Sequence, residues 1–239
     1  MPTDRQAAAR DPLGSATGNT GRRERNKEIK QARIFAAAAE LFAERGYAAV
    51  TTQQIAERAD VATGTLFRYA STKAELLLMV FNDDFRRNLD RGLRDVSVAA
   101  AATASATTSG TAETSRLILI LLTPLILAGR RSGANTAAYQ REILFGEPSE
   151  RYRAEALVLV DELQNAISNI LAPAARNAQQ NSGDTDSTLA ARAVSNVVHL
   201  ELARAALDGT PAPRVLSVVA AQIDLITRGH LKRAPGSGD

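Results

Sequence analysis

The 239-residue chain contains no cysteine and no tryptophan, and it has only two histidines. The absence of cysteine excludes a disulfide framework, cysteine-ligated zinc and catalysis by a thiol. The sequence also lacks a glycine-rich phosphate loop and a His/Glu pair at helical spacing, which are common signatures of nucleotide-dependent and metal-dependent enzymes. We therefore expect a protein that is not an enzyme and that needs no cofactor and no metal.

Long hydrophobic runs are missing as well. The longest run, at 117–128, is interrupted by Thr123 and Pro124, and it is shorter than the ~20 apolar residues that cross a bilayer. The first residues of the chain include no apolar segment of the kind found in a signal peptide. These absences predict a soluble, cytoplasmic protein that makes no membrane contact.

Helical periodicity, in contrast, is present along most of the chain. Apolar residues recur at intervals of three and four, and no stretch alternates as a strand does, so we predict an all-α fold. Composition divides the chain into a disordered arm at 1–21, a helix-turn-helix domain at 22–71 and a helical bundle at 72–233. Helices are expected at 22–45, 72–96, 113–131, 134–145, 148–171, 188–207 and 212–231, with connecting loops at 97–111 and 174–187.

The stretch at 51–73, TTQQIAERADVATGTLFRYASTK, predicts two short helices separated by a tight turn. Thr51 and Gln54 have the spacing of a capping box, which starts the first helix. Asp60 falls in the turn, where one residue must adopt a left-handed conformation that Asp tolerates better than most. Two such helices form a helix-turn-helix, and the second, which begins near Thr63, fits the major groove of DNA.

Charge is unevenly distributed along the chain. The net charge is only +3, yet between 22 and 33 there are six basic residues and two acidic ones. A charge run is usually a solvated helix face, but a basic run beside a helix-turn-helix is typical of a polyanion partner. We therefore predict that the partner is double-stranded DNA.

Four sequence runs carry a resemblance to a known family. They are LFAERGY at 41–47, IAERA at 55–59, GTLFRY at 64–69 and TKAELLL at 72–78. In this order and spacing they resemble the DNA-binding domain of the TetR family of transcriptional regulators, over about 25–78. The chain departs from the usual pattern of that family at Asp60, Ala62, Thr63, Phe67 and Ala70.

The resemblance implies a ligand-responsive regulator, most often a repressor. Such a protein binds a palindromic operator as a homodimer and is released by a small molecule held in the C-terminal domain. Small residues at the start of the recognition helix let the backbone approach the base edges, and polar or basic neighbours contact phosphates. The candidate DNA-binding residues are Arg22, Arg23, Arg25, Thr51, Gln53, Thr63, Gly64, Thr65, Phe67, Arg68, Tyr69 and Lys73.

The C-terminal domain is expected to enclose a pocket for a small apolar effector. Aromatic residues make up only 4% of the chain, which disfavours an aromatic cage for flat cations and favours an aliphatic or acyl ligand. His199 lies in an apolar run, so it is either a pocket residue or a histidine of the core or the interface. The candidate ligand-binding residues are Phe85, Thr123, Tyr139, Gln164, Asn196 and His199.

The last two predicted helices carry wide apolar faces. On the first, Ala191, Val194, Val198, Leu202 and Ala205 share a face, and on the second Val215, Val218, Val219, Ile223 and Ile226 do so. We expect these faces to pack across two chains as a four-helix bundle. The alternative to a DNA-binding regulator is a helical dimeric protein-interaction module in which the helix-turn-helix is vestigial.

Overall fold

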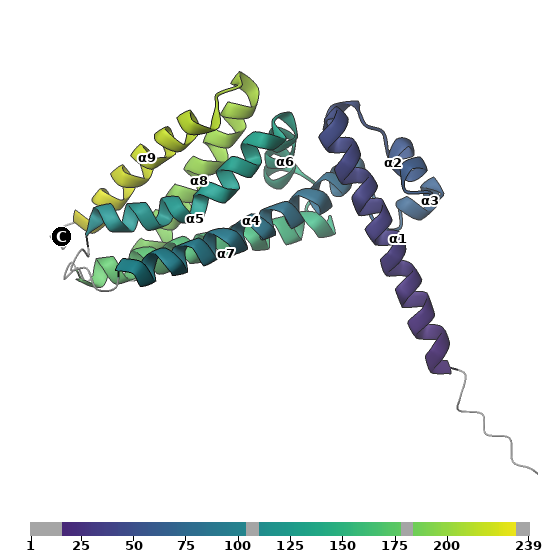
Figure 1. Cartoon of the computed structure of the whole chain (residues 1–239), viewed down its shortest axis with the longest axis horizontal. Helices are drawn as coiled ribbons and strands as arrows, with labels where there is room; N and C mark the ends of the chain where they lie inside the picture. Colours follow the sequence, from purple (N-terminus) through teal and green to yellow (C-terminus); the bar gives the residue numbers. More distant parts are fainter. Residues whose placement is uncertain (1–15, 104–109, 178–183, 233–239) are drawn as a thin grey trace, which may run out of the picture.

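The computed structural model describes residues 16–103, 110–177 and 184–232, and every regular element in these ranges is a helix. The all-α prediction is therefore confirmed for this part of the chain. Figure 1 shows the short helices of the N-terminal part at one end of the molecule and a bundle at the other. The elements are α1 (Ala16–Arg45), the 3-10 helix η1 (Tyr47–Ala49), α2 (Thr52–Arg58), α3 (Thr63–Leu66), α4 (Lys73–Thr103), α5 (Thr111–Ser132), α6 (Ala134–Phe145), α7 (Arg151–Asn177), α8 (Asp184–Asp208) and α9 (Ala212–Lys232).

Helix α1 is the platform of the N-terminal domain. Ile34, Leu41 and Phe42 on α1 are buried together with Ile55 of α2 and Leu66 of α3, and they form one core. α1 begins at Ala16, so the predicted arm is wrong for its last residues, which are helical; residues 1–15 lie outside the described part. Once a helix is nucleated, each further residue adds a hydrogen bond at little cost, and this favours extension beyond the packed core.

The end of α1 has the geometry that the sequence predicted. Gly46 has a φ of 77° and a ψ of 151°, a positive-φ conformation that glycine adopts without a steric penalty, and its N–H donates to the Phe42 carbonyl at 3.0 Å. The Tyr47 ring then packs on the Phe42 ring, with 5.7 Å between the centroids. This contact is the hydrophobic closure that accompanies such helix ends.

Helix α4 joins the two parts of the molecule (Figure 1). It starts with a modified capping box, because the Thr72 hydroxyl accepts from Glu75 N–H at 2.9 Å while the Glu75 carboxylate accepts from Ser71 N–H at 2.6 Å. α4 continues to Thr103, so the predicted end near residue 96 and the loop from 97 are wrong. The run VSVAAAAT at 96–103 is rich in alanine, the strongest helix former, and this explains the longer helix.

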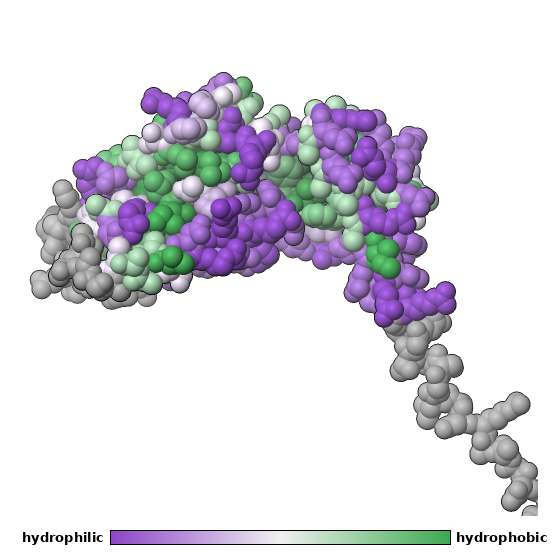
Figure 2. All heavy atoms as spheres, viewed as in Figure 1, coloured by the Kyte–Doolittle hydropathy of each residue, from purple (hydrophilic) through white to green (hydrophobic). Residues whose placement is uncertain are grey.

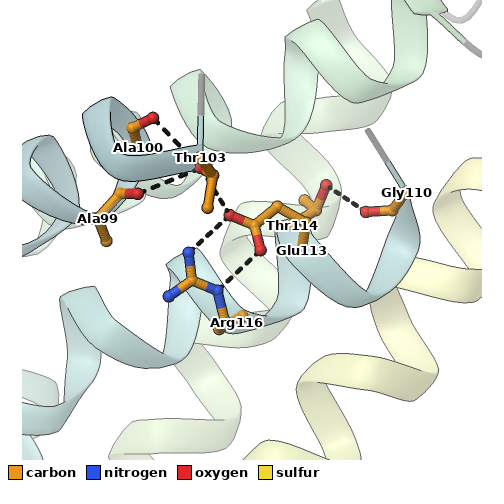
Figure 3. A network of polar contacts seen from close by, with 7 residues as sticks. All are labelled: Ala99, Ala100, Thr103, Gly110, Glu113, Thr114 and Arg116. Atoms are coloured by element: carbon orange, nitrogen blue, oxygen red, sulfur yellow. Dashed lines mark hydrogen bonds and ion pairs between the residues drawn. The ribbon is translucent and has the colours of Figure 1, made fainter. Parts of the chain in front are cut away.

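Polar contacts tie the end of α4 to the start of α5, as Figure 3 shows. The Thr103 hydroxyl lies 3.2 Å from the Glu113 carboxylate, and Arg116 donates two hydrogen bonds to Glu113 at 2.7 Å. The Arg116 guanidinium lowers the pKa of Glu113, so this carboxylate stays ionised. The two helices are therefore held together at this end of the bundle.

Helix α5 is the centre of the bundle and packs against α4, α9 and α7. Ile118, Leu121, Leu122 and Ile126 are fully buried along it. By length and composition alone α5 is apolar enough to cross a membrane, unlike every other helix in the described ranges. Its packing in the bundle is that of a core helix.

The predicted loop at 174–187 is shorter than expected. α7 runs through Pro173 to Asn177, and α8 already begins at Asp184, while residues 178–183 lie outside the described part.

Figure 2 shows that hydrophobic surface gathers on the bundle in the viewed face, between α9 and α4, while the surface of α1 is mostly hydrophilic.

The apolar faces that the sequence assigned to a dimer interface are mostly buried within one chain. Ala191 and Val194 of α8 and Val219 and Ile223 of α9 are fully buried in a core shared with α5 and α7. The prediction that these faces meet a second chain is wrong, because periodicity shows that a face is buried but not which chain covers it. Other leucines on these two helices are exposed: Leu189 by 55%, Leu200 by 58%, Leu207 by 82% and Leu225 by 71%.

At Gly92, α4 and α5 approach so closely that there is no space for a side chain. A Cβ atom at Gly92 would lie 2.2 Å from the Leu121 carbonyl oxygen. We expect Gly92→Ala to lower the free energy of unfolding by about 1–3 kcal/mol, because the backbones must move apart. The matched control is Gly229→Ala in α9, where a Cβ meets nothing within 4 Å, so this variant should be up to ~1 kcal/mol more stable than the parent. Chemical denaturation followed by circular dichroism measures both, and equal stability of the two variants would contradict the close packing.

Candidate nucleic-acid interface and effector cavity

The recognition helix α3 is short and exposed on its outer face. Leu66 is fully buried and anchors it, while Thr63 and Gly64 are exposed and Thr65 is half-buried. A side chain at Gly64 would point into open space. Phe67 is 44% exposed, so it is not a core aromatic. This face is therefore free to enter a groove of DNA.

The helix that precedes α3 begins with the predicted capping box. Gln54 N–H donates to the Thr51 hydroxyl at 3.2 Å, and Thr51 N–H donates to the Gln54 side chain at 2.9 Å. The Gln53 amide donates to Glu57 at 2.9 Å, so this predicted phosphate contact is engaged along α2. α3 has no side-chain cap at Ala62, and its stability depends on the packing of Leu66.

The turn between α2 and α3 has the predicted left-handed residue. Asp60 has a φ of 49°, the only positive φ of a non-glycine residue in the described ranges. Arg33 of α1 donates to the Asp60 carboxylate at 2.6 Å and to its carbonyl at 2.9 Å. One residue of the basic run therefore holds the turn on the platform helix, although an exposed ion pair of this kind contributes little free energy.

Two predicted DNA-binding residues at the edge of the motif make contacts within the domain. The Tyr69 hydroxyl donates to the Lys27 carbonyl at 3.2 Å. The Lys73 ammonium donates to the Tyr47 and Val50 carbonyls at 2.9 Å each and lies 4.4 Å from the centroid of the Tyr47 ring. Two of the three N–H donors of Lys73 are therefore engaged within the domain. The sequence signal that could have predicted these bonds is the end of α1 and of η1, because carbonyls at helix ends have no partner within the helix.

Lys73 is thus expected to act on stability and not on the electrostatics of DNA binding. We expect Lys73→Met to lower the free energy of unfolding by about 1–3 kcal/mol, since two carbonyls lose a charged donor. The slope of log affinity for DNA against log salt should stay unchanged, whereas loss of a phosphate contact lowers it by ~0.9 per contact. Arg68→Met is the matched comparison, because Arg68 is exposed beside the recognition helix. A lower salt slope for Lys73→Met would restore Lys73 as a phosphate contact.

The three predicted DNA-binding arginines near the start of α1 are all exposed. Arg22, Arg23 and Arg25 lie on α1 beyond the part of the helix that packs on α2 and α3. Figure 1 shows this half of α1 projecting past the helix-turn-helix, and Figure 2 shows that the coloured part of its surface is mainly hydrophilic. The charge therefore lies on the same side of the molecule as the recognition helix.

A small cavity of about 50 Å³ lies inside the bundle, between α4, α5, α6, α7 and α8. Three predicted ligand-binding residues line it, namely Phe85, Tyr139 and His199. The other three do not. Thr123 donates to the Leu119 carbonyl within its own helix, Gln164 is half-buried outside the lining, and Asn196 is exposed. The polar lining residues that the sequence did not single out are Asp84, Asn88, Ser132, Thr136 and Gln140.

Buried hydrogen bonds connect the cavity wall to the start of α7. The Tyr139 hydroxyl donates to the Asn82 amide oxygen at 2.9 Å, and the Asn82 amide nitrogen donates to the Tyr152 carbonyl at 2.8 Å. Burial, together with the negative charge of Asp84, raises the pKa of Tyr139, so this phenol stays neutral. The sequence signal that could have identified Thr136 and Gln140 as lining residues is their spacing from Tyr139. The three residues are three and four positions apart along α6 and therefore share one face.

His199 belongs to the cavity. Its Nδ1 atom lies 2.5 Å from the Gln140 amide oxygen, and its Nε2 atom is enclosed without a hydrogen-bond partner among the described residues. Burial lowers the pKa of His199 to about 4, so the ring is neutral at pH 7.

A second cavity, of about 370 Å³, lies between α1 and the bundle and shares Phe81, Asp84, Ala128 and Ser132 with the first. Asn135, at the start of α6, is buried beside it and bridges the two parts of the molecule. It accepts from Tyr47 N–H at 2.6 Å and donates to the Phe42 carbonyl at 2.8 Å. The Thr72 hydroxyl, directly before α4, donates to Glu150, directly before α7, at 2.8 Å. The cavities and the DNA-binding part are therefore linked through α6 and α4.

These features define a helix-turn-helix DNA-binding protein with a separate helical domain that contains a cavity. Residues 34–80 match the family described as "Bacterial regulatory proteins, tetR family". The chain belongs to the TetR family of transcriptional regulators, as its sequence motifs predicted.

Curated relatives agree with this assignment. The chain is 30% identical over 165 residues to the HTH-type transcriptional repressor KstR of Mycobacterium tuberculosis. These aligned residues cover 69% of this chain and 64% of the relative. It is 41% identical over 73 residues to KstR of Mycolicibacterium smegmatis, covering 30% of this chain and 33% of the relative. These matches span from a third to just under two thirds of the relatives' lengths.

The fold has solved counterparts. The crystal structure of Thermus thermophilus FadR, a TetR-family transcriptional repressor, in complex with lauroyl-CoA superposes with a TM-score of 0.60 at 22% identity. It covers 87% of this chain and 100% of that chain. At this identity the likeness shows the shared fold.

Proposed function

We propose that the protein is a ligand-responsive transcriptional repressor that binds a palindromic operator as a homodimer and is released by a small apolar effector. The observation that carries the proposal is the exposed recognition helix joined, through α4 and α6, to a bundle with an internal cavity. A single α3 reads too few base pairs for specificity in a genome. Two copies related by a two-fold axis read half-sites separated by roughly 34–36 Å, one turn of DNA.

The DNA contacts divide into two groups by their place in the structure. Thr63, Gly64 and Thr65 approach the base edges, because they are small residues at the start of α3. The exposed basic residues Arg22, Arg23, Arg25 and Arg68 contact phosphates and provide affinity without sequence preference. Thr51 and Phe67 border the groove, Thr51 through its exposed cap and Phe67 through its exposed ring.

The dimer forms through the exposed sides of α8 and α9. The inner sides of these helices are covered within the chain, while Leu200 and Leu225 are more than half exposed on the outer sides. Pairing two helices from each chain forms a four-helix bundle, with outer faces in place of the inner ones that periodicity suggested. Burial of these leucines from water drives the association.

The effector acts by shifting the equilibrium between two orientations of the DNA-binding parts. The first cavity holds only about 50 Å³, far below the ~300 Å³ of a typical ligand site, so a ligand must displace the walls formed by α4 and α6. Both helices are bonded to the N-terminal part, α6 through Asn135 and α4 through Lys73. A coupling of about 1–3 kcal/mol weakens DNA binding 5- to 150-fold.

The test is a mobility-shift titration with the DNA upstream of the protein's own coding region, repeated over a series of salt concentrations. A specific regulator binds this DNA more tightly than random duplex and shows a steep negative dependence on salt. A protein-interaction module with a vestigial helix-turn-helix shows neither a preference nor a steep slope, and that result would refute the proposal.

A further inference from the structure

His199 presents a hydrogen-bond acceptor to the cavity. The Gln140 amide oxygen can only accept a hydrogen bond, so the His199 Nδ1 atom, 2.5 Å away, must carry the hydrogen. A neutral ring with a hydrogen on Nδ1 has a lone pair on Nε2. That Nε2 atom is enclosed and has no partner in the described part of the chain. A buried acceptor without a donor is costly, and a ligand that donates a hydrogen bond removes the cost.

The other polar groups of the cavity also offer acceptors. The Thr136 hydroxyl donates to the Gly129 carbonyl at 2.6 Å, and the Tyr139 hydroxyl donates to Asn82 at 2.9 Å. Asn88 donates through its amide nitrogen to the Asp84 carbonyl at 2.7 Å. In Thr136 and Tyr139 the hydroxyl hydrogen is directed to the protein, so the oxygen is left to accept, while Asn88 keeps its amide oxygen as an acceptor and one further N–H as a donor.

We infer that the cavity binds an uncharged apolar alcohol whose hydroxyl group donates a hydrogen bond to His199 Nε2, in preference to a carboxylic acid or its thioester. This inference rests on the proposed function, in which the cavity holds the effector, and it specifies the chemical class of that effector.

Anionic and cationic head groups fit the cavity less well. A carboxylate has no hydrogen to donate at pH 7, so it leaves the enclosed His199 Nε2 unpaired, and it also carries a charge out of water into the cavity, which is unfavourable. An ammonium group can also donate to Nε2, but it carries a charge out of water towards an Asp84 carboxylate that is already paired with Arg87 at 3.3 Å, and burying a charge is costly. A thioester or an ether has no hydrogen to donate, and it leaves Nε2 unpaired. A hydroxyl group satisfies the acceptor without burying a charge.

The arrangement of the two cavities indicates where the apolar body of the alcohol lies. The first cavity, with its head-group site at His199, is too small for a long chain. It shares the Phe81 wall with the second cavity, which extends to Phe35 and Phe42 of α1. An alcohol with its hydroxyl at His199 therefore extends past Phe81 towards α1 and acts on the platform of the helix-turn-helix.

Calorimetric titration of the full-length protein at pH 7 with four ten-carbon probes tests the head-group preference. The probes are 1-decanol, decyl methyl ether, decanoate and decylamine. We expect 1-decanol to bind at least tenfold more tightly than each of the other three. Equal or tighter binding of the ether, decanoate or decylamine, or no binding of 1-decanol, overturns the inference.

Two variants test the role of His199 itself. In His199→Phe the acceptor is lost while an aromatic ring is kept. The ratio of the affinities for 1-decanol and the methyl ether should therefore fall to about 1. In Gln140→Glu the new carboxylate favours a doubly protonated ring, in which Nε2 becomes a donor. Decanoate should then gain at least tenfold relative to 1-decanol. If both variants keep the selectivity of the parent, His199 does not read the head group.

Failure of this inference can be separated from failure of the proposed function. The titrations use protein without DNA, and the mobility-shift experiment uses DNA without any probe. Specific operator binding combined with no preference for 1-decanol overturns the ligand class alone. Selective binding of 1-decanol combined with no DNA preference overturns the regulator and leaves the head-group chemistry standing.

Discussion

Gly64→Glu is expected to weaken operator binding by at least ~100-fold while the fold stays intact. A side chain at this position meets nothing within 4 Å, so the substitution costs no packing, and glycine is a poor helix residue. In the complex, each subunit of the dimer would place a carboxylate against the negatively charged groove. Like charges brought together in an interface cost several kcal/mol, which corresponds to the expected loss. A mobility-shift titration measures the change in affinity.

The matched control for this prediction is Gly229→Glu. Gly229 lies in α9, is also exposed, and has open space around it, so the variant makes the same chemical change far from α3. Its operator affinity should stay within about twofold of the parent, and both variants should unfold at or above the parent's midpoint. If Gly64→Glu binds the operator as well as Gly229→Glu does, α3 is not the element that enters the groove.

The double variant Leu200→Asp, Leu225→Asp is expected to be monomeric and to lose at least ~100-fold in operator affinity. Both leucines are exposed on the single chain, so the monomer tolerates the change, but a dimer would have to bury four carboxylates. Linked binding sites exceed the affinity of a single site by 10²–10⁴, and a monomer loses this gain. Sedimentation velocity at micromolar concentration gives the oligomeric state, and a mobility shift gives the affinity.

Leu93→Asp is the control for the dimer prediction. Leu93 lies on α4 and is 43% exposed, so the substitution again adds a charge at an exposed leucine of the bundle. This variant should remain a dimer with the operator affinity of the parent. If it becomes a monomer while the double variant stays a dimer, the interface lies on the face of α4 instead of α8 and α9.

Local sequence signals predicted the N-terminal domain in detail. The capping box at Thr51, the left-handed Asp60 and the helix end at Gly46 each depend on a few neighbouring residues, and all three are found in the structure. Helix boundaries at 134–145 and 212–231 were predicted to within one residue, since glycine and proline flank them. Such features are encoded locally and can be read from a single sequence.

Contacts between distant segments were harder to predict. The partners of Lys73 are the carbonyls of Tyr47 and Val50, and no spacing rule connects them. Three of the six predicted cavity residues do not line the cavity, and Gln140 was missed, because Gln140 and His199 meet only when α6 packs on α8. The alanine-rich end of α4 looked like a linker because low complexity resembles a loop in composition, while its intrinsic preference is helical.

The hydrogen bond from Tyr47 to Asn135 provides a natural probe of motion within the protein. The donor belongs to the DNA-binding half and the acceptor to the bundle, at 2.6 Å. Exchange of the Tyr47 amide hydrogen with deuterated solvent therefore reports how often the two halves part, whereas the Gly46 amide, bonded to Phe42 within the first half, reports local opening. The ratio of these two protection factors follows the separation of the halves with no need for operator DNA, a label or an added fluorophore.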